Sequence, residues 1–123
     1  MSVTWQSSKL VASESLPGVE FVIARMTFGR RLELMKRVRD LAARAEFFDA
    51  GRDEKNRMEA SLLGAEIDRL YIEWGVEEIR GLELDGQPAT ARLLVDKGPE
   101  DLFREILAAV KSECGLSETE RKN

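Results

Sequence analysis

The sequence predicts a mainly α-helical protein with a few short strands, an α+β arrangement organised around an antiparallel helical hairpin. Two long segments, residues 28–50 and 53–75, repeat apolar side chains at spacings of three and four, as amphipathic helices do. A third segment of this kind lies near the C-terminus, and a β-branched run lies near the N-terminus. These observations predict two packed helices, a C-terminal helix and a short N-terminal β segment.

The N-terminal part of the chain predicts the β segment. Residues 1–16 are polar and mixed, and we expect a flexible arm there. Residues 19–26 are short and β-branched, which is typical of a strand. Pro17-Gly18 is a turn signal, so residues 9–13 could instead pair with that strand as a hairpin.

The first long helix is expected to start after Thr27, a good N-cap, and to stop at Gly51. Asp53 caps the second helix, which Gly75 ends. Because only residues 51–53 connect them, the two helices are predicted to pack antiparallel. The predicted inward faces are Leu34, Val38, Leu41, Ala45 and Phe48, widened by Met35 and Ala42, against Met58, Leu62, Leu63, Ile67, Leu70, Tyr71 and Trp74.

The C-terminal third predicts short elements and one further helix. Residues 76–84 could form a strand, with Asp85-Gly86 as a turn pair, in a hairpin or a loop. Thr90 can cap a short helix through residue 95, and Pro99 suits the first position of a longer one that ends at Gly115. Residues 116–123 begin a helical pattern that is too short to be stable, so we expect a frayed tail on a single domain spanning 1–123.

The residue types present argue against the familiar enzyme classes. The chain has no histidine and one cysteine, Cys114, so His-based triads and the usual zinc sites have no ligands. The acids on the second helix, Glu66, Asp68 and Glu73, would need histidine to resemble a di-metal site. We therefore expect no catalytic residues, no metal and no cofactor.

Charge is divided unevenly along the chain, whose net charge is −4. Residues 1–44 carry 8 Lys/Arg against 4 Asp/Glu, and residues 45–123 carry 11 against 19. The basic side chains include Arg30, Arg31, Arg37 and Arg44, which fall off the apolar stripe and are expected to be solvated. A nucleic-acid partner is therefore not expected, and no apolar run is long enough to span a membrane.

Large aromatic side chains are the candidates for binding a partner. Phe47 and Phe48 are adjacent, and a helix cannot bury both against the same neighbour. Trp5 lies on the polar arm, where it can act as an anchor. With Tyr71 and Trp74 of the second helix, these residues form the predicted partner-binding set, although core burial is the competing interpretation for most of them.

Several segments resemble a family of small phage proteins. They comprise residues 16–19, 26–34, 70–75, 81–86, 98–100 and 120–123. Together they resemble tail assembly chaperones of long-tailed bacteriophages and prophages, over most of the chain. These motifs are structural rather than catalytic.

The resemblance implies a non-enzymatic late protein of the host cytoplasm. Its expected partners are the tape-measure protein, which it would keep soluble, and tail-tube subunits, which it would help to recruit. The resemblance also implies a ribosomal frameshift site at Arg121-Lys122-Asn123, which would give a longer product. A structural virion protein of the tail or connector, and a small regulatory or adaptor protein, are the alternatives; self-association is compatible with each.

Overall fold

The computed structural model describes residues 1–51 and 53–115. The predicted frayed tail, residues 116–123, lies outside the described residues, as does the frameshift hypothesis that falls on them. The predicted fold class is confirmed: the protein is mainly helical, with short antiparallel strands. In chain order the elements are β1 (Ser8–Ala12), β2 (Glu20–Ala24), α1 (Phe28–Asp49), α2 (Glu54–Gly75), β3 (Val76–Arg80), β4 (Glu83–Leu84), β5 (Gln87–Pro88), α3 (Ala91–Lys97) and α4 (Glu100–Glu113).

Three strands form an antiparallel sheet in the order β1-β2-β3. β1 occupies part of the segment expected to be an arm, and it pairs with β2 across the Pro17-Gly18 turn, which was the alternative interpretation. β2 is the central strand, and three of its five residues are buried. β3 follows α2 without a loop, so α2 leads directly into the sheet edge.

The β4–β5 pair settles the nature of the stretch around Asp85 as a small hairpin. Asp85 and Gly86 have positive φ angles of 51° and 79°. Two consecutive residues with positive φ are what a type I′ turn requires, and Asp-Gly is a favoured pair for it. The strands are shorter than the predicted range because the chain turns at Gly81, whose φ is also positive at 79°.

Side-chain caps begin three of the four helices in the described part of the chain. Thr27, Asp53 and Thr90 each accept a hydrogen bond from the backbone N–H three residues on, at 3.1, 2.8 and 3.1 Å. These are the predicted caps, and each satisfies a donor that the first turn leaves free. Pro99 differs from its predicted place by one residue: it is the N-cap of α4 rather than its first helical residue.

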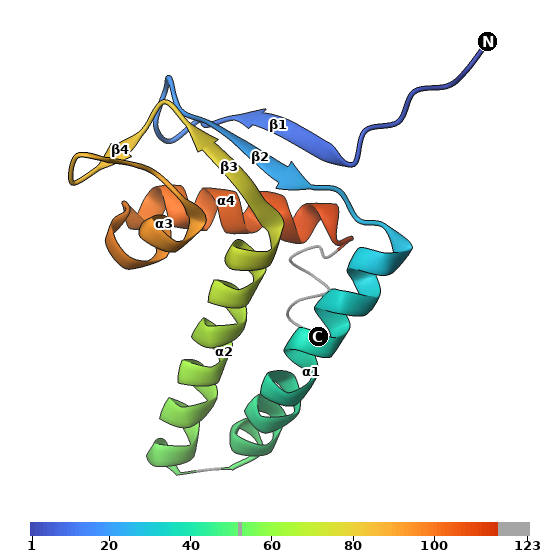
Figure 1. Cartoon of the computed structure of the whole chain (residues 1–123). Coiled ribbons are helices and arrows are strands. Elements are labelled where there is room, and N and C mark those ends of the chain that lie inside the picture. The colour runs from blue at the N-terminus through green and yellow to red at the C-terminus, as the bar shows by residue number, and fades with distance from the viewer. Residues whose placement is uncertain (52, 116–123) are drawn as a thin grey trace.

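The protein consists of a body and a projecting hairpin. Figure 1 shows α1 and α2 running side by side away from the sheet and from α3 and α4. The body is held by buried apolar side chains of β2, α2, β3, the β4–β5 region, α3 and α4, among them Phe21, Ile72, Leu94 and Ile106. Among the described residues, α1 contributes none to this core; its one buried side chain, Leu34, lines a small hollow together with Tyr71 of α2 and Cys114 at the end of α4. We call α1 and α2 together the hairpin.

Candidate partner-binding surface

The five aromatic residues predicted to bind a partner occupy different environments. Trp5 precedes β1 and is exposed. Phe47 is 75% exposed near the far end of α1, whereas Phe48 beside it is half-buried. Their rings meet edge to face with centroids 5.3 Å apart. Tyr71 and Trp74 are half-buried and pack against the core of the body.

The structure therefore leaves Trp5 and Phe47 as available aromatic anchors and places Tyr71 and Trp74 at the margin of the core. Phe47 and Phe48 are the one pair of this set that it brings into contact. The expectation that a helix cannot bury both Phe47 and Phe48 agrees with their different exposures.

A second apolar stripe on α1 was missed. Phe28, Leu32 and Met35 are 81%, 44% and 58% exposed. Their spacing of four and three places them along one side of the helix, separate from the stripe that contacts α2. That spacing was a usable signal, but Met35 was assigned to the inward face, and this assignment is wrong. We call Phe28, Leu32 and Met35 the outer stripe.

The predicted inward face of α2 needs a similar correction. Met58 and Leu62 are exposed, whereas Leu63 is buried and Ile67, Leu70, Tyr71 and Trp74 are half-buried. The side of α2 that carries Ala65 and Arg69 borders a groove with α3 and α4, near Leu94 and Phe103. Met58 and Leu62 lie one to two turns nearer the tip of the hairpin, at the spacing that continues this side. They are exposed because α3 and α4 do not extend that far.

Basic side chains surround the outer stripe. Residues 28–40 contain Arg30, Arg31, Lys36, Arg37 and Arg39 against Glu33 and Asp40, five cations minus two anions, a net charge of +3. Glu33 pairs with Arg37 at 2.7 Å and Asp40 with Arg39 at 3.5 Å, all exposed. Arg30 also meets Glu77 of β3, so five cations face three anions here and the local net charge is +2.

Two adjoining hollows lie beside the outer stripe. One is a shallow apolar depression on α1 lined by Leu32, Met35, Lys36, Val38 and Arg39. The other, about 110 Å³ in volume, shares Met35 and Val38 and reaches inward between α1, α2 and the end of α4; Met26, Arg31, Leu34, Tyr71 and Cys114 complete its lining.

Cys114, at the floor of the inner hollow, is 6% exposed. Burial, the largest influence, raises the pKa of its thiol to about 11; Arg31 opposes the rise and Glu113 adds to it. Burial also raises the pKa of Tyr71, helped by Cys114 and Asp68. A thiol held protonated at neutral pH is a poor nucleophile.

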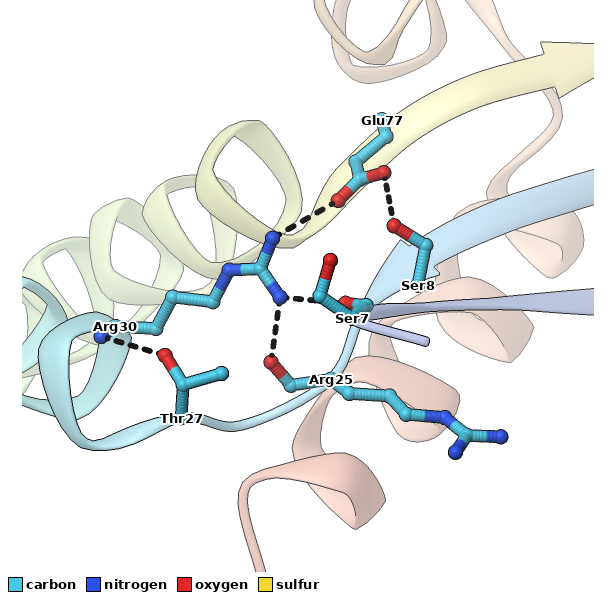
Figure 2. A network of polar contacts seen from close by, with 6 residues as sticks. All are labelled: Ser7, Ser8, Arg25, Thr27, Arg30 and Glu77. Carbon is cyan, nitrogen blue, oxygen red and sulfur yellow. Dashed lines mark hydrogen bonds and ion pairs between the residues drawn. The ribbon is translucent and has the colours of Figure 1, made fainter. Parts of the chain in front are cut away.

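The root of the hairpin is fixed by Arg30, which was expected to be solvated. Its guanidinium donates to the carbonyl oxygens of Ser7 and Arg25, the latter at 2.9 Å, and lies 3.5 Å from a carboxylate oxygen of Glu77. Glu77 also accepts from the Ser8 hydroxyl at 2.6 Å. Figure 2 shows this network joining the start of α1 to β1, to the end of β2 and to β3.

Two of the three acids on α2, Asp68 and Glu73, form ion pairs with cations. Asp68 accepts from Lys111 Nζ at 2.9 Å, which ties α2 to α4, and Lys111 also lies over the Tyr71 ring, 5.4 Å from its centroid. Glu73 pairs with Arg69 at 3.3 Å. Within residues 1–51 and 53–115, no group of three or more His, Cys, Asp or Glu side chains is placed to hold a metal ion. The helices described here include none with both the length and the hydropathy to cross a membrane.

Comparison with known proteins finds no matching family model, no matching curated protein and no matching solved structure.

Proposed function

We propose that this protein is a non-enzymatic tail assembly chaperone of a long-tailed phage or prophage, which binds helical segments of the tape-measure protein and helps to recruit tail-tube subunits. The proposal begins from the family resemblance of the sequence motifs. The observation that carries it is the exposed apolar surface of the projecting hairpin, where Phe28, Leu32, Met35, Phe47, Met58 and Leu62 all face solvent.

An exposed apolar surface on a helical hairpin suits a helical client. A long protein with apolar stripes aggregates unless a second amphipathic surface covers those stripes. Helices recognise one another through anchors at positions i, i+4 and i+7, the spacing of Phe28, Leu32 and Met35. The hairpin thus offers a client a surface of the right kind without removing any residue from the core of the body.

A tagged-protein capture from cells assembling the phage tests the proposal. Mass spectrometry would identify proteins retained by the chain and would measure the chain in purified particles. We expect the tape-measure protein among the retained proteins and no copy of the chain in finished particles. Abundance of the chain in particles would support the alternative of a structural tail or connector protein and contradict the chaperone proposal.

A double variant tests whether the hairpin is the part of the protein that retains the client. Leu62→Glu with Met35→Glu places charge in two exposed apolar sites and should reduce retention of the client, while Ala108→Glu on an exposed position of α4 serves as a matched control. Equal retention by all forms of the chain would place client binding away from the hairpin.

A further inference from the structure

The outer stripe and its basic surroundings define a surface with a chemistry of its own. Phe28, Leu32 and Met35 expose apolar area along about 10 Å of α1, taking 1.5 Å of rise per residue. Met35 stands where the two hollows meet, so the surface is concave there rather than a smooth helix side.

The charged residues that line the two hollows are all basic, although Arg39 also lies 3.5 Å from Asp40. Lys36 and Arg39 line the shallow hollow itself, and Arg31 lines the inner one. Neither hollow has an aspartate or glutamate in its lining among the described residues. A ligand seated here must therefore present apolar groups at its centre and negative charge at its edges.

We propose that the outer stripe binds an acidic amphipathic helix from a separate protein. Apolar residues of that helix would pack on Leu32 and Met35, and its flanking Asp and Glu would face Lys36 and Arg39. A helix is favoured over an extended segment because the stripe presents ridges at helical spacing and no free strand edge. The inference deepens the proposed function and rests on it in one respect, that the hairpin binds a helical client.

Two other macromolecular occupants fit less well. Nucleic acid would bring phosphates to the basic residues, but it would leave Phe28, Leu32 and Met35 facing a charged backbone. A second copy of the chain would have to supply an acidic apolar helix face. The exposed apolar pair on α2, Met58 and Leu62, has Arg57 beside it as well as Glu54 and Glu59, which makes that face mixed rather than acidic.

A synthetic peptide tests the inference with the full-length chain. The probe is an amphipathic helix of about 18 residues with Leu at the apolar positions and Glu beside them, and the control peptide carries Lys in place of Glu. We expect fluorescence anisotropy to show saturable binding of the acidic peptide, weakening as salt rises, and at least about tenfold weaker binding of the basic one.

Matched variants locate the site. Met35→Glu, and separately the pair Lys36→Glu with Arg39→Glu, should each weaken binding of the acidic peptide by about tenfold or more. Ala108→Glu on α4 and Arg57→Glu on α2, both exposed positions away from the outer stripe, should change it less than about twofold. Because every altered side chain is exposed, the thermal midpoint should stay near that of the wild type, which checks that a loss of binding is not a loss of fold.

Four outcomes would overturn the inference. The two peptides could bind equally well, or a duplex DNA fragment could bind in place of the acidic peptide. Sedimentation could show a dimer that Met35→Glu dissociates, or Glu118→Lys with Glu120→Lys could tighten peptide binding by about tenfold, which would assign the surface to the chain's own residues. The capture experiment with the phage can fail independently of the peptide experiment. Peptide binding without a retained phage client would remove the proposed function alone, and a client retained equally by wild type and Met35→Glu would remove this site alone.

Discussion

At the scale of single residues, Arg30 has a role that its neighbours on α1 lack. Arg37, one side of an exposed pair with Glu33, could lose its charge at little cost to stability. Arg30 instead satisfies two backbone carbonyl groups and meets Glu77, so it links three strands to the start of a helix (Figure 2). Removing it takes one donor away from each of these acceptors, although Ser7 still accepts from the Arg25 N–H and Glu77 from the Ser8 hydroxyl.

We predict that Arg30→Ala lowers the free energy of unfolding by about 1–3 kcal/mol, as expected when hydrogen bonds to a charged donor are lost. Arg30→Lys should recover little of this, because one ammonium group cannot reproduce the planar fork that reaches Ser7, Arg25 and Glu77 together. Urea denaturation measures both variants, with Arg37→Ala as the control, whose loss should stay below about 0.5 kcal/mol. A full recovery by lysine would show that charge alone matters at this position.

Cys114 gives a prediction for alkaline pH. The pKa of its thiol is raised from 9.0 to about 11 in the folded protein. A group with a raised folded-state pKa contributes stability that is complete below its unfolded-state pKa and is lost as pH rises through the folded value. Between about pH 9 and pH 11 the wild type should therefore lose on the order of 2 kcal/mol more than Cys114→Ala, at about 1.4 kcal/mol per pKa unit.

Urea denaturation of both proteins at pH 8, 9, 10 and 11 measures this difference. Cys114 contributes to the raised pKa of Tyr71, so both proteins should also carry Tyr71→Phe, which removes that hydroxyl from the comparison. A constant gap between wild type and Cys114→Ala across the range would show that Cys114 ionises as easily in the folded protein as in the unfolded chain.

At the scale of elements, α2 and α4 pack so closely that one position admits only glycine. A Cβ atom added to Gly75 would lie 2.6 Å from Val110 Cγ1, and Val110 is 1% exposed. Its branched side chain has little freedom to move aside. Gly64, on the same helix, has open space where its Cβ would be.

The two glycines of α2 should therefore respond in opposite directions to alanine. We predict that Gly75→Ala destabilises the protein by about 1–3 kcal/mol through overpacking. Gly64→Ala should stabilise it by about 0.5–1 kcal/mol, because alanine is the better helix former. Thermal unfolding measures the stability of both variants. When Val110→Ala is also present, Gly75→Ala should destabilise the protein less. Additive losses of stability would contradict a clash between the new Cβ atom and Val110.

The elements show what sequence alone could predict. Thr27, Asp53 and Thr90 were identified as caps because capping depends on a few neighbouring residues. Met58 and Leu62 were misplaced because their burial depends on how far α3 and α4 extend along α2, which no local pattern encodes. Tyr71 and Trp74, two of the predicted binding residues, pack at the margin of the core, and this too depends on where α4 and the rest of the body lie against α2. The outer stripe was overlooked although its spacing is visible in the sequence.

At the scale of the whole molecule, stability is divided between the body and the hairpin. The body joins β2, β3, α3, α4 and the end of α2 in one buried cluster. α1 is held by its contacts with α2 and by Arg30 at its root, and the described residues of α1 add nothing to that cluster. A segment with few buried apolar contacts opens at a lower free energy than the core around which the protein folds.

We therefore predict that native-state hydrogen exchange separates the two parts. Amides in the second half of α1 and the first half of α2 should exchange through openings several kcal/mol cheaper than global unfolding, while β2 and α4 exchange near the global limit. Urea dependence of exchange is the measurement, since a partial opening has a smaller slope than global unfolding. Equal protection throughout would show one cooperative unit. If protection is unequal, a client bound along α1 stabilises the part of the protein that opens most easily. Added client should then slow hydrogen exchange in the hairpin and leave the exchange rates of β2 and α4 unchanged.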